Sequence, residues 1–283
     1  MADRPILVLA AIGGQGRAVT AALLDRGAEV RALVRDPGSP GAQALSRRGV
    51  EVVSGLLEDV DSLTGAMRGV AGVFALTTPF ESGVEAEVAQ GRAILAAVRE
   101  ADVPHLVFSS VAGAAQRTGV PHFDSKAIVE SEVRASGVPY TILGPTYFFD
   151  NALGDQERIL AGSLDLPLPS DRPLQQLARS DHGAFAAQVL VHAGKYAGRR
   201  IELASDAPTP AEMSRSLSAA VGFEVRHNRY PLESIRNPDM HAMWEFLNGP
   251  GYQVDITALH AAHPEIEWTS FATWAQRVFA SGS

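Results

Sequence analysis

A short apolar run that leads directly into a glycine-rich turn limits the possible folds of this chain more than any other feature. Residues 6–9 read Ile-Leu-Val-Leu, and Gly13-Gly14-Gln15-Gly16 follows shortly afterwards. A helical pattern over 18–24 comes next and ends before Gly27. Such a turn lets backbone N–H groups approach a pyrophosphate at a helix N-terminus. A tight turn without any ligand is the alternative, but its place after the first strand favours a ligand.

The first half of the chain alternates apolar runs with amphipathic stretches. One helical pattern, over 84–98, places its apolar residues on one face at a spacing of 3.6. Strands that alternate with helices predict a parallel sheet covered on both faces. We therefore expect an α/β fold with a Rossmann-type doubly wound sheet in residues 1–150. The predicted strands are 6–9, 29–34, 51–53, 72–76, 105–109 and 140–143.

The regular alternation ends after about Pro145, and residues 151–283 predict a smaller α+β lobe for a substrate or a partner. Thr209 and Glu212 have the spacing of a capping box, with Pro210 at the first helical position. The expected elements are a helix over 180–193, a strand over 200–203 that rejoins the sheet, a helix ending at Ala220, a strand within 223–230, and a mostly helical tail over 256–279 packed by Trp268, Phe271 and Trp274.

Composition excludes several classes of protein. The 283 residues carry a formal net charge of -8, which argues against a general nucleic-acid binder. No cysteine is present, so disulfides, thiolate catalysis and Cys-ligated metal sites are excluded. No uncharged stretch approaches the roughly 18 residues of a spanning helix, and the short run at 6–12 is a poor signal peptide. We expect a cytoplasmic protein that does not bind membranes, and the arginine-rich, lysine-poor composition suggests a bacterial source.

Ala10 stands where the first glycine of a Gly-x-x-Gly-x-x-Gly loop would be. Alanine is a small loss in a tight turn provided that its φ is negative. Gly13 would let phosphates come close, and Gly16 would let the helix pack tightly on the strand.

Two arginines, Arg31 and Arg35, lie on the second strand and at its end. A site that binds NAD usually carries an acid there for the ribose 2′-hydroxyl, whereas a guanidinium binds a 2′-phosphate. Arg35 therefore favours NADP(H) over NAD(H). The alternative is that both arginines are solvated charges at a strand end.

Several motifs in order along the chain make it similar to a known family. They are residues 10–16 (AAIGGQG), 30–36 (VRALVRD), 72–79 (GVFALTTP), 122–126 (HFDSK), 144–151 (GPTYFFDN) and 252–259 (YQVDITAL). The chain resembles the NmrA-like family, atypical members of the short-chain dehydrogenase superfamily that include isoflavone-reductase-like and quinone-reductase-like proteins. The resemblance implies a Rossmann core, a small substrate lobe and an NAD(P) cofactor.

The resemblance also implies which positions bind the cofactor. Residues 13–16 would hold the pyrophosphate, Arg35 the 2′-phosphate and Lys126 the nicotinamide ribose. The full set comprises Gly13, Gly14, Gln15, Gly16, Arg35, Thr77, Thr78, Pro79, Phe80, Ser109, Lys126, Pro145, Tyr147 and Phe148. The chain departs from the family at Ala10, and at Leu56, where an acid near the adenine is common.

Ordinary short-chain dehydrogenases use Tyr-x-x-x-Lys to move a proton while a hydride is transferred. This chain lacks that motif, and His122-x-x-x-Lys126 is its nearest equivalent. On a helix the two residues share a face, and a histidine exchanges protons near neutral pH. We name Lys126 and His122 as catalytic candidates. The alternatives are a histidine that only packs or caps at the helix start and a surface lysine.

Other patterns predict no further chemistry. His260 and His263 have helical spacing for a metal but lack a further ligand, so no metal site is expected. Asp181-His182 could form a dyad, although a helix cap at Ser180 or Asp181 is the preferred interpretation. A Gly-x-Ser-x-Gly elbow is missing, which excludes a common hydrolase class. Some aromatic residues could line a flat apolar pocket, with core packing as the default: Phe148, Trp244, Phe246 and Trp268.

The sequence favours two functions. The first is an NADPH-dependent reductase that transfers a hydride to a planar conjugated small molecule such as a quinone or an enone. The second is a non-catalytic NADP(H) sensor that acts through a protein partner, which the missing tyrosine would explain. A monomer or a homodimer is expected in either case.

Overall fold

A seven-stranded parallel sheet forms the centre of the protein. The computed structural model describes residues 4–280. The strand order is β10-β6-β5-β4-β1-β2-β3, and the chain reverses direction across the sheet between β1 and β4. The strands are β1 (Ile6–Val8), β2 (Val30–Val34), β3 (Glu51–Ser54), β4 (Gly72–Leu76), β5 (Leu106–Ser109), β6 (Tyr140–Pro145) and β10 (Arg199–Leu203). The doubly wound fold and all six strands predicted in the first half are confirmed.

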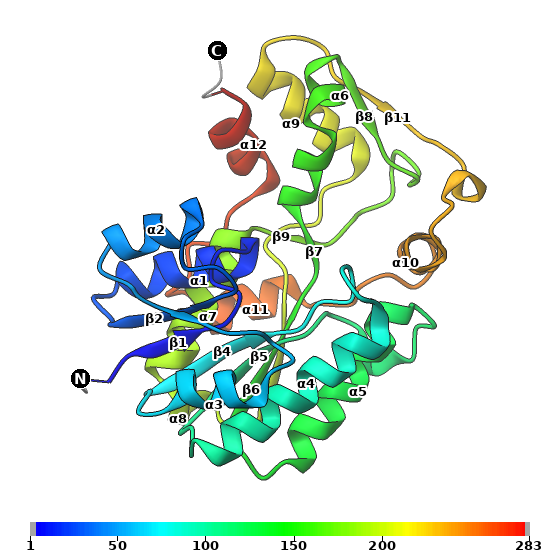
Figure 1. Cartoon of the computed structure of the whole chain (residues 1–283). Helices are drawn as coiled ribbons and strands as arrows, with labels where there is room; N and C mark the ends of the chain where they lie inside the picture. The colour runs from blue at the N-terminus through cyan, green and yellow to red at the C-terminus, as the bar shows by residue number, and fades with distance from the viewer. Residues whose placement is uncertain (1–3, 281–283) are drawn as a thin grey trace.

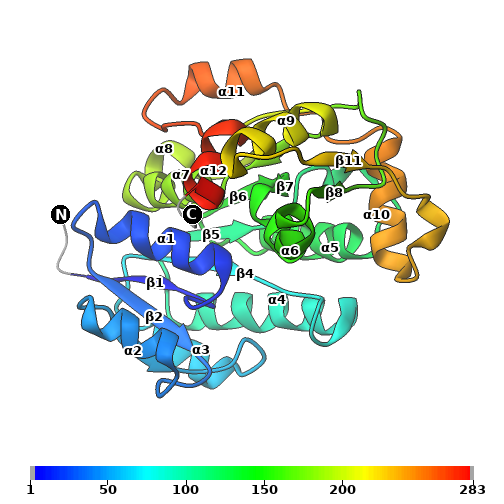
Figure 2. The same ribbon diagram turned by 90° about the horizontal axis from the view of Figure 1, so that it is seen from above.

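Helices cover both faces of this sheet, as Figures 1 and 2 show. α1 packs against α7 on one face, and α3, α4 and α5 pack side by side on the other. The helices of this lower part are α1 (Gly14–Leu24), α2 (Pro40–Arg47), α3 (Val60–Met67), α4 (Gly83–Glu100), α5 (Pro121–Ala135), α7 (Arg179–Val191), α8 (Ala193–Tyr196) and α11 (Ile256–Ala262), with the 3-10 turn η1 (Ala114–Gln116).

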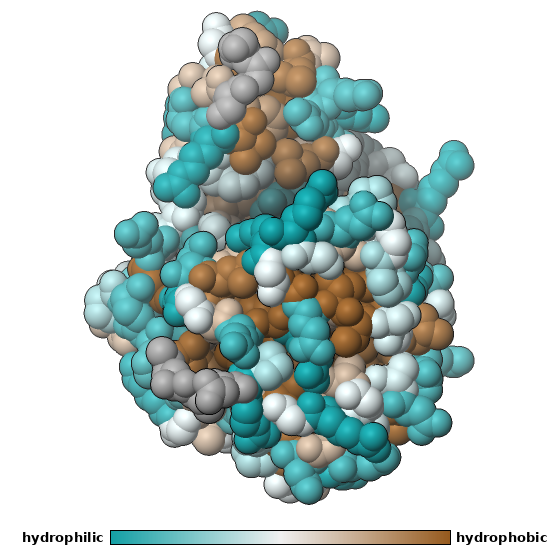
Figure 3. All heavy atoms as spheres, turned by 60° about the vertical axis from the view of Figure 1, so that its left-hand side comes forward, coloured by the Kyte–Doolittle hydropathy of each residue, from teal (hydrophilic) through white to brown (hydrophobic). Residues whose placement is uncertain are grey.

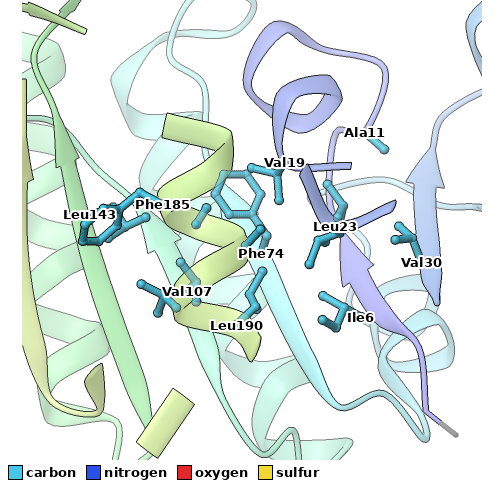
Figure 4. Packing of buried hydrophobic residues seen from close by; sticks show 14 of the residues in the cluster. Ile6, Ala11, Val19, Leu23, Val30, Phe74, Val107, Leu143, Phe185 and Leu190 are labelled. Carbon is cyan, nitrogen blue, oxygen red and sulfur yellow. The ribbon is translucent and has the colours of Figure 1, made fainter. Parts of the chain in front are cut away.

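The first strand shows why an uninterrupted apolar run was needed. Ile6 and Val8 point into the core under α1 and α7, while Leu7 and Leu9 point into the opposite core. Figure 4 shows the first of these cores, with Phe74 of β4 near the middle and Phe185 of α7 beside Leu143. Because both faces of a parallel sheet are buried, alternation between apolar and polar residues is absent from the strand.

A smaller part of the molecule stands above the carboxyl ends of the strands (Figure 1). Its own apolar core includes Phe149, Leu217 and Trp274. The elements are β7 (Tyr147–Phe148), η2 (Phe149–Asp155), α6 (Gln156–Leu160), β8 (Ser163–Asp165), β9 (Gln176–Leu177), α9 (Pro210–Val221), β11 (Arg226–Asn228), η3 (Leu232–Ser234), α10 (Pro238–Asn248) and α12 (Phe271–Phe279). Figure 3 shows, from the side of α1 and α2, the narrow waist between this upper part and the broader lower part.

The second half of the chain contributes to both parts. The predicted returning strand is confirmed as β10, which pairs in parallel with β6. The capping box of Thr209 and Glu212 is also confirmed at the start of α9. α7 packs on the lower core, to which Leu259 of α11 also belongs, so residues 151–283 do not all lie in the upper part. The boundary near residue 150 stays a prediction.

Candidate functional site

The candidate site is a groove at the carboxyl ends of β1 and β4, where the sheet reverses its direction of winding. This switch point is where open α/β sheets bind ligands. Two adjoining cavities form it, which we call the inner cavity (about 520 Å³) and the outer cavity (about 450 Å³). Their shared lining residues are Ala10, Gly13, Leu76 and Thr78.

Most of the predicted site residues meet in this groove. Arg35 lines the outer cavity, and Gly16 and Ser109 line neither cavity. The predicted residues along the inner cavity are Gly13, Gly14, Gln15, Thr77, Thr78, Pro79, Phe80, His122, Lys126, Pro145, Tyr147 and Phe148. The grouping was predicted largely from resemblance, and their roles toward a ligand stay predictions.

The glycine-rich turn is built as a cradle. In the described chain, the backbone N–H groups of Gly14, Gln15 and Gly16 have no acceptor, and no side chain caps α1. A Cβ on Gly16 would lie 2.3 Å from the carbonyl oxygen of Ala10, so only glycine allows this close packing. Unpaired N–H groups at a helix N-terminus fit a phosphate group.

The condition of a negative φ is not met at Ala10. Its φ is +49°, in the left-handed region that alanine enters at a cost of roughly 1–2 kcal/mol. The turn is closed by a hydrogen bond, because the carbonyl of Ala10 accepts from the N–H of Gly13. Alanine at residue 10 therefore carries backbone strain within a hydrogen-bonded turn.

Arg35 and Arg31 separate in the structure. Arg31 pairs with Glu51 and donates to the carbonyl of Ala66, so it is a structural residue away from the groove. The Arg35 side chain is 68% exposed and pairs at 2.7 Å with Glu81 at the mouth of the outer cavity. Leu56, 46% exposed, also lines this cavity, so an apolar side chain stands where an acid was expected.

Lys126 is buried at the floor of the inner cavity, which contradicts the alternative of a surface lysine. Its ammonium donates to the carbonyl oxygen and the hydroxyl of Thr77, at 2.7 and 3.1 Å. It also pairs at 2.6 Å with Glu87, which is fully buried and accepts from Ser125. Burial lowers the pKa of Lys126, and the Glu87 carboxylate opposes this effect. The three N–H donors are thus fixed in direction before any ligand binds.

His122 forms a second polar pair beside Lys126. It is the second residue of α5, and its Nδ1 lies 2.6 Å from the carboxylate of Asp239 in α10. Asp239 also accepts from the backbone N–H of His122. A carboxylate at Nδ1 fixes the tautomer and orientation of an imidazole. His122 therefore packs at the helix start and also presents Nε2, which has no hydrogen-bond partner within residues 4–280, from the wall of the inner cavity.

Ser109 supports the cradle from below. Its hydroxyl lies 2.7 Å from Oε1 of Gln15 and 3.2 Å from Nε2 of His182. Burial lowers the pKa of His182 to about 3, so this imidazole is neutral at ordinary pH. Ser109 thus orients Gln15 rather than lining the groove itself.

Aromatic and thioether side chains form the remaining wall of the inner cavity. Tyr147 and Trp244 lie with ring centroids 5.6 Å apart. Phe80, on the lower part, is 71% exposed, which is unusual for its size. Met240, Met243, Trp244 and Tyr252 come from the second half of the chain. Of the four aromatics considered from sequence, Phe148 and Trp244 line the cavity, whereas Phe246 and Trp268 do not.

The other sequence candidates have structural roles. The predicted cap at Ser180 or Asp181 is wrong, because Ala178 is the N-cap residue of α7 and no side chain caps it. Asp181 instead accepts from Ser205 and Thr269, which ties α7 to the segment after β10 and to the tail. His260 stacks on Trp268. Within residues 4–280 no group of three His, Cys, Asp or Glu side chains could hold a metal ion.

Sequence reasoning missed Glu87, Asp239 and Arg179. Glu87 occupies the apolar face of α4 beside Val84, Gly91 and Ile94, and an acid at such a position is a usable signal of a buried partner. Asp239 is brought to His122 only by the tertiary fold, and no local pattern marks it.

The fold and the groove define a dinucleotide-binding α/β protein of the Rossmann type. The family model of the NmrA-like family matches residues 2–274, and the chain belongs to this family. No helix within residues 4–280 is long and apolar enough to cross a membrane.

Individual relatives agree with this membership. The chain is 30% identical over 232 residues to an NAD(P)H azoreductase of Xenophilus azovorans, covering 82% of this chain and 79% of the relative. It is 33% identical over 237 residues to a (4-alkanoyl-5-oxo-2,5-dihydrofuran-3-yl)methyl phosphate reductase of Streptomyces griseus, with the same coverage.

Among solved structures, quinone oxidoreductase QOR2 of Escherichia coli complexed with NADPH aligns with a TM-score of 0.81 at 24% identity, over 97% of this chain and 99% of that one. Triphenylmethane reductase of a Citrobacter species, complexed with NADP(H), aligns with a TM-score of 0.82 at 22% identity, over 96% and 99%. The fold is thus shared along 96–97% of the chain, and the prediction of NADP(H) as the cofactor agrees with these complexes.

Proposed function

We propose that this protein is an NADPH-dependent reductase that transfers a hydride to a planar conjugated small molecule, such as a quinone or an enone. The observation that carries the proposal is the inner cavity, which joins the glycine-rich turn to an aromatic chamber containing His122 and Lys126. A phosphate cradle and titratable side chains thus meet in one space. When bound, the cofactor supplies the hydride.

The chain's own residues would hold the cofactor along the groove. The unpaired N–H groups of residues 14–16 would bind its diphosphate. Arg35 would bind the 2′-phosphate. Its exposed ion pair with Glu81 would be replaced by two hydrogen bonds from the guanidinium to the phosphate. Lys126 would bind the nicotinamide ribose. Because its three donors are already engaged, a ribose hydroxyl would replace Thr77 Oγ1, the most distant of the present partners.

A reduced carbonyl or quinone also requires a proton on oxygen, and the site has two candidates. His122 has Nδ1 committed to Asp239, so Nε2 is the position at which the ring exchanges a proton with the cavity. Lys126 pairs with Glu87 and would stabilise negative charge that develops nearby. We assign proton transfer to His122 and charge stabilisation to Lys126.

The shape of the chamber supports a flat acceptor. Tyr147, Phe148 and Trp244 present ring surfaces, and aromatic faces stack favourably on conjugated rings. The names of the relatives include a quinone, an azo compound and an oxo-dihydrofuran, which are all conjugated acceptors. Met240 and Met243 add flexible apolar surface that tolerates acceptors of different shapes.

Steady-state oxidation of NADPH with a panel of quinones, enones and azo dyes tests the proposal. We expect turnover with at least one acceptor class, and we expect His122→Gln to reduce kcat by roughly tenfold to a hundredfold. Asp239→Asn should reduce kcat less and alter the pH profile, because it acts through His122. NADPH binding without turnover of any acceptor would contradict the reductase and favour the sensor that acts through a protein partner.

A further inference from the structure

Arg179, the first residue of α7, lies directly against the glycine-rich turn although it is 165 residues away from Gly14 in the sequence. A Cβ built on Gly14 would lie 2.7 Å from Nη1 and 2.8 Å from Cζ of Arg179. Such distances are below any normal contact, so the missing side chain of Gly14 is what admits the guanidinium. The Arg179 side chain also lines the inner cavity and is 35% exposed.

The guanidinium lacks strong partners in its present position. Its nearest carboxylate, Asp150 of η2, lies 3.7 Å away, too far for a hydrogen bond. Its other contact is with the ring of Phe148, 5.7 Å from Cζ to the centroid. Within residues 4–280 its N–H groups donate no hydrogen bond. An arginine has five such donors, and leaving them unused beside a cavity is costly unless a ligand or water takes them.

The surroundings of this guanidinium favour an anion. Beside it, Gly14, Gln15 and Gly16 of the glycine-rich turn present N–H groups without acceptors. The first turn of α1 contains no acidic residue that would compete. A planar cation and a row of N–H groups together match a phosphate or diphosphate better than either alone.

We propose that Arg179 binds the diphosphate of the dinucleotide together with the glycine-rich turn against which it lies. This inference rests on the proposed cofactor and goes beyond it by adding a binding residue from the second half of the chain. Gly14 then has a second task, because it makes room for Arg179 as well as for the phosphate. Asp150 holds the guanidinium loosely and is displaced as a partner when the diphosphate is present.

Calorimetric titration of the full chain with three ligands tests the proposal: NADPH, 2′-phospho-ADP-ribose, which retains the diphosphate, and 2′-AMP, which lacks it. We expect Arg179→Met to weaken the binding of NADPH and of 2′-phospho-ADP-ribose by roughly tenfold to a hundredfold. The binding of 2′-AMP should weaken by less than about twofold. Arg215→Met removes the same charge from an exposed site on α9, and it should change the affinity for each of the three ligands by less than about twofold. Circular dichroism checks that each variant is folded.

Gly14→Ala sharpens the test through a double-mutant cycle. In the otherwise unaltered protein, the added methyl group should displace the guanidinium and weaken the binding of NADPH. In the Arg179→Met background, the same methyl group should weaken NADPH binding clearly less. Asp150→Asn should leave NADPH affinity unchanged or improve it a few-fold, because it frees the guanidinium.

Three results would overturn the proposal. Equal weakening of 2′-AMP and NADPH by Arg179→Met would mean a general structural or electrostatic role. Unchanged binding of all three ligands, with a raised KM for an acidic acceptor, would assign Arg179 to the substrate. An equal loss of NADPH affinity on Gly14→Ala in both backgrounds would mean that Gly14 and Arg179 act independently. If the unaltered protein bound none of the ligands, the proposed function itself would fail, which is a distinguishable outcome.

Discussion

Arg35 in the outer cavity and Lys126 in the inner cavity are both cations of the same groove, but the protein holds them in different ways. The Arg35 side chain is 68% exposed and has a single exposed partner, Glu81. The Lys126 side chain is 10% exposed and has three partners, including a carboxylate that no solvent reaches. An exposed ion pair contributes little to stability, so its cation acts mainly by binding a ligand. A buried ion pair is oriented when the protein folds, and loss of one partner is strongly destabilising.

Exposure and the number of partners distinguish a cation that serves ligand binding from one that is also part of the folded core. Arg35 can be lost with little damage to the fold, because solvent already screens it. Lys126 cannot be lost alone, because Glu87 would remain buried without compensation. Substitutions at the two cations should therefore differ in their effects on stability and on cofactor choice.

The largest effect is expected for Lys126→Met. Turnover should fall at least about a hundredfold, and the free energy of unfolding should fall by about 3–5 kcal/mol. The double variant Lys126→Met/Glu87→Gln removes both charges, so it should recover most of the stability but none of the turnover. Chemical denaturation and steady-state kinetics measure the two quantities. A single variant as stable as the unaltered protein would contradict the buried pair.

Arg35→Ala should act on cofactor choice alone. We expect the preference for NADPH over NADH to fall by roughly tenfold, with an unfolding free energy within about 0.5 kcal/mol of the unaltered protein. The ligand-induced rise in the thermal midpoint, measured for both cofactors, reports the preference. Glu81→Gln is the matched control, and it should favour NADPH slightly by releasing Arg35. An unchanged preference in Arg35→Ala would remove Arg35 from the site.

Much of this contrast could not be predicted from the sequence. The turn at 13–16 and the strands are visible because apolar runs and glycines mark them locally. Lys126 was found because one of only two lysines falls on a family motif. The buried partners were missed because Glu87 and Asp239 acquire their roles through contacts between α4, α5 and α10, which local patterns do not encode.

The backbone conformation of Ala10 also could not be predicted from the sequence. The sequence shows that alanine replaces glycine at residue 10, but it does not show the φ of +49° that the turn imposes. The shape of the turn is set by the close approach of α1 to β1 at Gly16, which overrides the preference of Ala10. Packing between elements therefore determined what local propensity could not.

His182 extends the comparison to a neutral buried group below the inner cavity. Its pKa is about 3 in the folded protein, against an ordinary value near 6.5. The unfolded chain therefore binds the proton first, and the native state loses about 1.4 kcal/mol of stability per pH unit from this residue as the pH falls below 6.5. His182→Gln should be less stable at pH 7 but lose stability less steeply in acid. Parallel curves of unfolding free energy against pH would contradict this account.

The smallest effect is expected for Ala10→Gly in the turn that joins the two cavities. Relief of the positive φ should raise the free energy of unfolding by about 0.5–1 kcal/mol. Ala11→Gly is a matched control on the next, fully buried residue, and it should destabilise the protein. Thermal unfolding of the two variants measures the difference. A loss of stability in Ala10→Gly would mean that the turn carries no strain.

Calorimetric titration of the unaltered protein with NADPH and NADH decides whether this groove binds a phosphorylated nicotinamide cofactor. Both titrations should saturate at one cofactor per chain, and NADPH should bind at least about tenfold more tightly. Equal affinity for NADH would contradict the role of Arg35, and the absence of binding by either cofactor would contradict the account as a whole.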